Sequence, residues 1–357
     1  MADFYNIKVA DIYKETEDTS VITFDIPSEL EEEFKFRQGQ HLTLKADIDG
    51  EDVRRSYSLC SSPFENQWKV AVKQIPEGKF STYINEKVKV GDHIDVMSPS
   101  GTFGVNCNPD NAKNYLFFAA GSGITPVLSM IKTHLAIEPN STCKLFYVNK
   151  TAKSIIFKED LEQLRNKYFG RLEIYYFLTK ERRDIELFNG RFDDEKMKVL
   201  TRTFIDIPDT SEVFLCGPEQ MVNFVSNYLV EAGLPKELIH FELFVTGLSK
   251  KVKPVGNNTQ IEKKEEVAIT IIDGGKEFHF GMTNNDDNVL DTALIAGADL
   301  PFACKGGVCS TCKCRVIEGS VKMKVNYALD EKEVSEQLVL SCQAVPTSKK
   351  VILNFDV

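Results

Sequence analysis

Four cysteines in the C-terminal part of the chain constrain its fold more than any other feature. Cys304, Cys309 and Cys312 form the pattern C-x4-C-x2-C, and Cys342 follows far downstream. This is the plant-type spacing for the ligands of a [2Fe–2S] cluster, in which four thiolates converge on two iron ions. The glycine pair between the first two cysteines lets the loop wrap closely, because glycine has no Cβ. The spacing therefore predicts an iron–sulfur centre.

A structural zinc site is the main alternative for these thiols. Zinc sites favour paired C-x2-C knuckles, and this region holds one such pair. A zinc-stabilised binding protein would give a colourless preparation, which separates the two hypotheses. Four other cysteines are interpreted as small, buried hydrophobic residues without a ligand role: Cys60, Cys107, Cys143 and Cys314.

Length and charge exclude several classes of protein. A chain of 357 residues is longer than one hydrophobic core usually supports, so two or three domains are expected. The net charge of −10 argues against nucleic-acid binding as the main task, which needs a clustered basic surface. No apolar run approaches the roughly 20 residues of a membrane span, and no secretory signal is visible. Unpaired cysteines at cluster spacing then favour a reducing, cytoplasmic location.

The chain shows three successive patterns of secondary structure. Residues 1–106 alternate short β-rich runs (20–26, 41–46, 68–72 and 93–97) with glycine turns, and a helix is expected over 80–86. Such spacing predicts an antiparallel barrel or sandwich. Residues 107–248 alternate buried strands (115–120, 144–148, 172–178 and 212–215) with helices (127–134, 159–168 and 219–231). That alternation predicts a doubly wound α/β domain.

A polar stretch, 249–266, separates these domains from the last one. It is rich in Lys, Glu, Asn and Gln and lacks aromatic residues, so it is interpreted as a linker. Residues 267–357 form the cysteine-containing domain, with a hairpin expected over 267–280 and a helix over 289–296. We see no internal repeat.

The first domain carries a candidate flavin motif. Arg55, Tyr57 and Ser58 form R-x-Y-S at a strand end and could supply a cation for a pyrophosphate, an aromatic face and a hydroxyl. A second element, 78–82 (G-K-F-S-T), opens the expected helix, where free N–H groups favour a phosphate. Arg and Tyr near a strand are also common surface residues. R-x-Y-S therefore indicates flavin binding only together with the motifs that follow.

Two glycine turns follow buried strands of the second domain. Residues 121–126 (G-S-G-I-T-P) lead into a helix, and their glycines let the backbone approach a dinucleotide pyrophosphate. The sixth position is proline, so this is not the standard Rossmann fingerprint. Residues 216–218 (C-G-P) end a second strand, and the sheet edge shared with 121–126 predicts a cofactor crevice. Each motif alone could be an ordinary strand–helix turn.

The choice of dinucleotide depends on the loop after the second α/β strand. Residues 149–153 (N-K-T-A-K) contain no acidic side chain to bind an adenosine ribose hydroxyl. Lys150 and neighbouring cations instead favour a 2′-phosphate, so NADPH is the expected donor, and Arg182 and Arg183 are further candidates.

The order of these motifs resembles the ferredoxin–NADP reductase superfamily over the whole chain. The C-terminal cluster domain matches its oxygenase-reductase branch. Within that branch, residues 36–44 (F-R-Q-G-Q-H-L-T-L), 119–126 and 299–314 (D-L-P-F-A-C-K-G-G-V-C-S-T-C-K-C) are similar to reductases that serve di-iron epoxidases. The resemblance implies a β-barrel FAD domain, a doubly wound nicotinamide domain and a β-grasp ferredoxin domain. It also implies electron delivery to a carboxylate-bridged di-iron oxygenase.

The resemblance assigns roles by position. FAD would be held by Arg55, Tyr57, Ser58, Leu59, Gly78 and Ser81. The residues expected to contact the dinucleotide are Gly121, Gly123, Thr125, Pro126, Lys150, Cys216, Gly217 and Pro218. Among these, the residues expected at the site of reaction are Tyr57, Ser58 and Cys216, and Phe244 is a further residue that would cover the flavin. The cluster ligands would be Cys304, Cys309, Cys312 and Cys342.

Other interpretations of the same motifs remain open. The acceptor could be an aromatic-ring dioxygenase or another monooxygenase, which reconstitution with each oxygenase would decide. A redox sensor could bind flavin and cluster without turning over nicotinamide, and a steady-state assay separates this case. Three cations near the cysteine loop are expected to form the docking surface for the acceptor: Lys305, Lys313 and Arg315.

Overall fold

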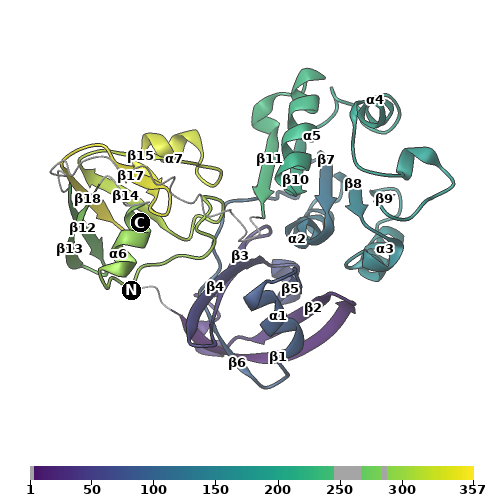
Figure 1. The fold of residues 1–357 in the computed structure, drawn as a ribbon. Coiled ribbons are helices and arrows are strands. Elements are labelled where there is room, and N and C mark those ends of the chain that lie inside the picture. The colour runs from purple at the N-terminus through teal and green to yellow at the C-terminus, as the bar shows by residue number, and fades with distance from the viewer. Residues whose placement is uncertain (1–3, 245–266, 284–287) are drawn as a thin grey trace. The chain divides into compact units, whose positions relative to one another are not determined.

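The computed structural model describes residues 4–244, 267–283 and 288–357 (Figure 1). The predicted linker, 249–266, lies outside the described residues. The chain divides into two compact units. The larger unit holds most of residues 5–244, and the smaller one contains the described residues after 266.

The first part of the larger unit is an antiparallel β-barrel of six strands, in the order β4-β3-β6-β1-β2-β5. A bridge between Leu59, just after β4, and Val70 of β5 joins the two ends of this order. Branched and aromatic side chains alternate along the strands and fill the interior with a core that includes Phe24, Leu42 and Val70. The elements are β1 (Tyr5–Thr16), β2 (Thr19–Asp25), β3 (His41–Ile48), β4 (Glu51–Ser58), β5 (Trp68–Lys73), β6 (His93–Val96) and α1 (Lys79–Glu86).

The second part is a parallel sheet in the order β11-β10-β7-β8-β9. Helices α2 and α3 lie on one face of the sheet and α4 and α5 on the other (Figure 1), which is the doubly wound arrangement. The strands are β7 (Asn114–Ala120), β8 (Thr142–Asn149), β9 (Leu172–Leu178), β10 (Glu212–Gly217) and β11 (Ile239–Leu243). The helices are α2 (Ile124–Ile137), α3 (Lys158–Lys167), α4 (Asp194–Thr203) and α5 (Glu219–Glu231).

Helix α2 joins the barrel to the parallel sheet. Its buried face belongs to a hydrophobic core that also includes the barrel residues Val21 and Ala71. Two buried polar contacts reinforce the junction: the Ser129 hydroxyl donates to the Ser61 carbonyl at 2.6 Å, and the Ser62 and Thr133 hydroxyls lie 3.0 Å apart. Buried polar groups that satisfy one another fix orientation as well as contact. The barrel and the sheet therefore form one packed body.

The smaller unit is built on a five-stranded mixed sheet in the order β13-β12-β18-β14-β16. Helix α6 packs on this sheet through Val289, Leu290 and Ala293, in a core separate from those of the larger unit. The elements are β12 (Val267–Asp273), β13 (Lys276–Met282), α6 (Val289–Ile295), β14 (Lys313–Glu318), β15 (Val321–Met323), α7 (Glu331–Ser335), β16 (Leu338–Leu340), β17 (Ala344–Pro346) and β18 (Lys350–Asn354).

The predicted architecture is confirmed. The expected strands and helices are present with ends shifted by a few residues. The sequence analysis gave no residue range for three elements of the larger unit, which are β1, α4 and β11. It placed a strand end near Ser58 but did not predict the full length of β4. Within the described residues, no helix is both long and apolar enough to cross a bilayer.

Candidate functional site

The cysteine loop of the smaller unit has a backbone shaped around its thiols. Lys305, Gly307 and Ser310 all adopt positive φ angles, of 51°, 77° and 51°. A Cβ on Gly307 would lie only 3.1 Å from the Val325 carbonyl oxygen, so this position needs glycine for space as well as for conformation. Non-glycine residues held at positive φ are strained, which is typical of a loop that serves a site.

Backbone N–H groups point at the cysteine sulfurs, as a thiolate cluster requires. The Gly306 N–H lies 3.3 Å from Cys304 Sγ. The pKa of Cys304 is lowered to about 7, first by a hydrogen bond from Cys309 and then by the N–H groups of Gly306 and Val308. The pKa of Cys342 is also lowered, chiefly by a hydrogen bond from Cys312. The four thiols therefore lie in two close pairs. The donors favour the thiolate form of Cys304 and Cys342, whereas the hydrogen bond to that partner sulfur, together with burial, raises the pKa of Cys309 and of Cys312 well above the usual range.

The cations near this loop are paired within the unit. Lys305 binds Asp291 at 2.7 Å, and Lys313 binds Glu333 at 3.1 Å. Arg315 donates to the Glu336 carbonyl. Acidic groups of α6 and α7 therefore pair with the two lysines, and the role of the three cations in acceptor docking stays a prediction.

The two glycine turns of the larger unit meet at the carboxyl edge of the parallel sheet. A Cβ on Gly123 would lie 2.1 Å from the Cys216 carbonyl oxygen. Gly217 has a φ of 157°, and a Cβ there would lie 3.0 Å from Ala120 Cβ. The loops after β7 and β10 therefore touch backbone to backbone, and side chains are excluded from the contact. The expectation that they share a sheet edge is confirmed.

The Gly121 turn itself leaves open backbone. Gly121 has a φ of 54°, and a Cβ added there would meet no atom within 4 Å, so nothing of the described chain covers it. Tyr147 donates its hydroxyl hydrogen to the Gly121 carbonyl at 2.9 Å, and Thr125 donates to the Ser122 carbonyl at 3.0 Å. Pro126 is buried in the first turn of α2, where its missing N–H costs no hydrogen bond. These contacts fix a half-buried turn at the start of a long helix, and the N-terminus of a helix suits a phosphate.

Three residues from different parts of the larger unit meet at one point. Ser58, at the end of β4, donates its hydroxyl hydrogen to Glu242 Oε2 at 3.0 Å. Glu242 lies on β11 directly beside Cys216 of β10. Cys216 is fully buried, and burial together with the Glu242 carboxylate raises the pKa of its thiol well above the usual range. The thiol is therefore protonated and unreactive as a nucleophile.

Sequence reasoning missed Glu242. The residue has no motif of its own, and its position opposite Cys216 depends on the parallel pairing of β10 and β11. The available signal was its place on the last strand of the sheet, two residues before Phe244. Phe244 packs partly buried against the core that contains Cys216.

The remaining flavin-motif residues lie at the end of β4 and at the start of α1. Arg55 is exposed and donates to the Arg54 carbonyl at 2.7 Å, while the Tyr57 ring packs 5.9 Å from the Phe80 ring. Ser81 is buried, and its hydroxyl accepts from Ile75 N–H and donates to the Gly78 carbonyl. A Cβ on Gly78 would lie 2.5 Å from this hydroxyl oxygen. Gly78 and Ser81 thus build the turn that exposes the N-terminal N–H groups of α1.

The opposite end of the crevice carries several cations. Lys150 and Lys153 are exposed after β8, and Lys180 is exposed after β9. Arg182 lies 3.8 Å from Glu186, and Arg183 donates to the Tyr176 carbonyl. Arg182 and Arg183 are exposed as well, so these loops carry several cations that an anion could reach. The acidic side chain of Glu181 also lies here, 2.8 Å from the N–H of Ala152.

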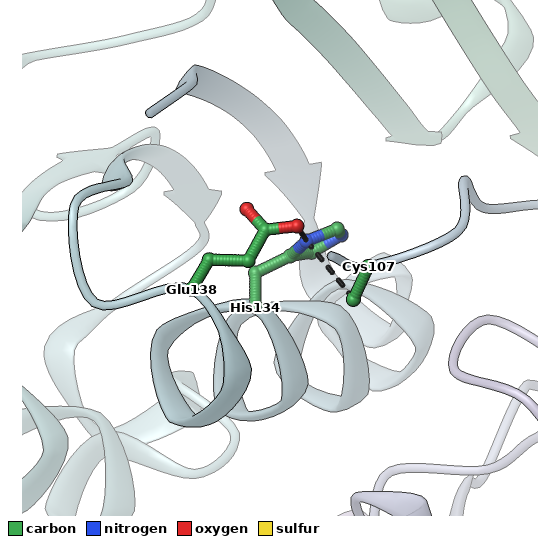
Figure 2. A group of neighbouring side chains, drawn as sticks. All are labelled: Cys107, His134 and Glu138. Atoms are coloured by element: carbon green, nitrogen blue, oxygen red, sulfur yellow. Dashed lines mark hydrogen bonds and ion pairs between the residues drawn. The ribbon is translucent and has the colours of Figure 1, made fainter. Parts of the chain in front are cut away.

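A second group of metal-binding residue types lies away from these sites. Figure 2 shows Cys107 and Glu138 on either side of His134, whose Nδ1 is 3.2 Å from the Cys107 sulfur and 3.5 Å from Glu138 Oε1. Each carboxylate oxygen of Glu138 already accepts two further hydrogen bonds, together from Asn108, Asn111, Tyr115 and Ser141. The buried His134 Nε2 has no partner within the described residues, whereas a metal-bound histidine normally donates from its other nitrogen. The group is a hydrogen-bonded node rather than a metal centre.

This node corrects one expectation. Cys107 is half-buried and shares hydrogen bonds with His134 and Gln38, so it is not a buried hydrophobic residue. Cys107 lies in the connection between the barrel and the sheet, whereas Gln38 precedes β3 and His134 lies on α2, so the local sequence did not reveal this contact. Cys60, Cys143 and Cys314 are buried, as predicted.

Comparison with known families defines the class of protein. Residues 6–104 match the oxidoreductase FAD-binding domain, residues 117–227 the oxidoreductase NAD-binding domain, and residues 271–347 the 2Fe-2S iron-sulfur cluster binding domain. The three matches follow the order of the barrel, the parallel sheet and the cysteine-containing unit. The chain is therefore an oxidoreductase of the flavin, nicotinamide and iron–sulfur type.

Two known proteins that align with nearly the whole chain define its family more closely. The chain is 41% identical to a subunit of 1,2-phenylacetyl-CoA epoxidase from Escherichia coli K12, over 100% of this chain and 99% of that one. It is 31% identical to the ferredoxin reductase component of 3-ketosteroid-9-alpha-monooxygenase from Rhodococcus rhodochrous, over 98% and 96% of the two chains. The chain belongs to the family of oxygenase reductase components.

Solved structures agree on the fold. Phthalate dioxygenase reductase, described as a modular structure for electron transfer from pyridine nucleotides to [2Fe–2S], aligns with a TM-score of 0.58 and 22% identity over 99% and 98% of the chains. An intact type IV self-sufficient cytochrome P450 monooxygenase aligns with a TM-score of 0.69 and 23% identity, over 98% of this chain and 41% of that one.

Proposed function

We propose that this chain passes electrons from NADPH, through FAD and a [2Fe–2S] cluster, to a carboxylate-bridged di-iron oxygenase that epoxidises phenylacetyl-CoA. The observation that carries the proposal is the 41% identity to the epoxidase component over the full length of both chains. The corresponding domains are FAD-binding (1–106), NAD(P)-binding (107–248), linker (249–266) and ferredoxin-like (267–357). We also propose a cytoplasmic location, since the cysteines are free thiols.

The flavin end of the site uses the barrel. The Arg55 guanidinium would pair with the FAD pyrophosphate, and the Tyr57 ring would offer an aromatic face to the isoalloxazine. Ser58 would present its hydroxyl to the flavin ring, and its hydrogen bond to Glu242 keeps that hydroxyl in place. Leu59, Gly78 and Ser81 shape the surrounding backbone, and the N–H groups at the start of α1 meet phosphate.

The nicotinamide end uses the carboxyl edge of the parallel sheet. Gly121, Gly123, Thr125 and Pro126 present the N-terminus of α2 to the dinucleotide pyrophosphate. Cys216, Gly217 and Pro218 form the floor under the nicotinamide. The protonated Cys216 thiol packs there without reacting, which keeps the floor apolar and excludes water.

The cysteine loop holds the cluster through Cys304, Cys309, Cys312 and Cys342. The chemistry supplied by the bound cofactors is the conversion of a two-electron hydride into single electrons. The protein contributes alignment and electrostatic tuning: N–H donors at the cluster sulfurs stabilise negative charge on them. No general acid or base is required.

The choice of NADPH rests on the cations at the far end of the crevice. The side chains of Lys150 and Lys153 are both exposed, so their ammonium groups are accessible to a 2′-phosphate. A comparison of kcat/KM for NADPH and NADH tests this part of the proposal. A preference for NADH would contradict it.

Reconstitution tests the acceptor. The purified chain, NADPH and a phenylacetyl-CoA epoxidase oxygenase component should together form the epoxide, whereas omission of this chain should abolish turnover. An anaerobic NADPH titration followed by visible absorption should bleach flavin and cluster in turn. A preparation without iron and sulfide, or with iron that stays oxidised, would contradict the proposal, and the second result would favour a redox sensor.

A second acceptor is favoured by a specific observation. The 31% identity to a 3-ketosteroid-9-alpha-monooxygenase reductase component, again over almost the whole chain, leaves another monooxygenase or an aromatic-ring dioxygenase as the alternative. Faster reduction of such an oxygenase than of the epoxidase component, at equal concentrations, would decide for it.

A further inference from the structure

The loops that follow β8 and β9 are joined by a short backbone ladder. The Thr179 N–H donates to the Asn149 carbonyl at 2.9 Å, and the Lys180 N–H donates to the Lys150 carbonyl at 2.8 Å. This ladder extends the parallel pairing of the two strands by two residues. The position of the next residue, Glu181, is therefore fixed relative to the loop after β8.

Glu181 uses this position to reach across to the neighbouring loop. Its Oε2 accepts the Ala152 N–H at 2.8 Å. The loop after β8 lacks an acidic residue in its own sequence, but the structure supplies one from the loop after β9. The same two loops carry the exposed lysines Lys150, Lys153 and Lys180, and Glu181 is exposed as well.

The sheet order indicates which part of a dinucleotide meets this edge. The chain reverses direction across the sheet between β7 and β10, and ligands of doubly wound sheets bind at such a switch point. The pyrophosphate lies after β7, and the nicotinamide lies toward Cys216 on β10. The adenosine ribose then extends to the other side of β7, over the loop after β8.

We propose that Glu181 sets the dinucleotide selectivity of this chain by opposing the adenosine 2′-phosphate and accepting a ribose 2′-hydroxyl. The inference rests on the proposed function and deepens it. A 2′-hydroxyl donates a hydrogen bond to the carboxylate, as acidic residues do in NAD sites. A 2′-phosphate is repelled by it, and the nearby lysines offset that repulsion. The ratio of kcat/KM for NADPH to kcat/KM for NADH is accordingly smaller than it would be if the lysines acted without Glu181.

The test compares two single-charge changes in the same loop of the full-length holoprotein. Glu181→Gln removes the carboxylate at Ala152, and Asp184→Asn removes another exposed carboxylate of the same loop. The ratio of kcat/KM for NADPH to that for NADH is measured with an artificial electron acceptor. Removal of one like charge close to a phosphate should raise this ratio about tenfold in E181Q, whereas D184N should stay within about twofold of the parent.

Binding of two fragments gives a second readout that does not depend on turnover. E181Q should bind 2′,5′-ADP more tightly than the parent, while its affinity for 5′-AMP should not increase. Retention of the flavin and cluster absorption establishes that the variant is folded. An unchanged kcat/KM ratio in E181Q, or an equal rise in D184N, would overturn the inference. Failure of the proposed function looks different, because the parent would then turn over neither nucleotide.

Discussion

The cysteine loop and the crevice around Cys216 place their functional groups by different means. One loop, 304–312, contains three of the four proposed cluster ligands, and its positive φ angles shape the backbone locally. The crevice instead gathers Ser58 from β4, Gly123 from the turn after β7, and Cys216 and Glu242 from neighbouring strands. The first site depends on local backbone conformation, and the second depends on the packing of the whole larger unit. A substitution in the cysteine loop should therefore affect the cluster alone. A substitution around Cys216 should also alter the positions of the other groups that meet there.

The largest effect is expected at the cluster. Cys309→Ala should lose iron and sulfide and lower reduction of one-electron protein acceptors about 100-fold or more, since four thiolates are needed to hold the two irons. Reduction of ferricyanide by NADPH through the flavin should persist, because the larger unit has its own cores. Iron analysis and visible absorption measure the loss.

Cys314→Ala is the matched control in the same loop region. Cys314 is fully buried two residues after Cys312 but is not among the ligands. This variant should keep its iron and lose only about 1–2 kcal/mol of stability from the small cavity. Equal loss of iron in both variants would contradict the ligand assignment.

A smaller but still large effect is expected where the two glycine turns meet. Gly123→Ala would place a Cβ 2.1 Å from the Cys216 carbonyl and must push the turns apart. A shift of this size should lower kcat/KM for NADPH about 100-fold at most, since misplacement by about 1 Å has effects of that order. Stopped-flow reduction of the flavin measures it.

The control for this change is Gly233→Ala. Gly233 also has a positive φ, of 100°, but a Cβ there meets no atom within 4 Å. It should destabilise the protein modestly without altering flavin reduction. If Gly233→Ala slowed hydride transfer as much as Gly123→Ala, the crevice would respond to general destabilisation rather than to the contact.

An intermediate effect is expected from the contact that links the barrel to the sheet. Ser58→Ala and Glu242→Gln should each slow flavin reduction about tenfold, and the double variant should be little slower than either, with a coupling of about 1.4 kcal/mol. Glu212→Gln, which changes a glutamate at the opposite end of β10, serves as the control. Additive effects of the two substitutions would show that Ser58 and Glu242 act separately.

The smallest effect concerns pH and the Glu138 node. Burial alone would raise the pKa of this carboxyl, but hydrogen bonds from His134 and its other neighbours outweigh burial and lower the pKa to about 2, from an ordinary value near 4.5. Its contribution is therefore fully present above about pH 4.5 and is lost as the pH falls toward 2, by about 2 kcal/mol. Urea unfolding between pH 6 and pH 3 should show a weaker pH dependence in Glu138→Gln than in the parent. An identical dependence would exclude this role.

The same difference between the sites explains what could be predicted from the sequence. The cluster ligands follow from spacing alone, because the loop that holds them is continuous. The strands of the barrel and sheet follow from hydrophobic alternation and buried runs, although β1 and β11 were not singled out. Glu242 and Glu181 could not be found in this way. Each acts on a neighbouring element, so its partner is fixed by strand pairing rather than by distance along the chain.

The junction at α2 has a consequence for how such chains can be recombined. The barrel and the parallel sheet share buried side chains and hydroxyl contacts through Ser129 and Thr133. Gene rearrangement that separated those halves would expose apolar surface on both, whereas the smaller unit carries a core of its own and can be transplanted as a cassette. Fused domains are therefore expected before the barrel or after the parallel sheet, and not at a point that separates the barrel from α2.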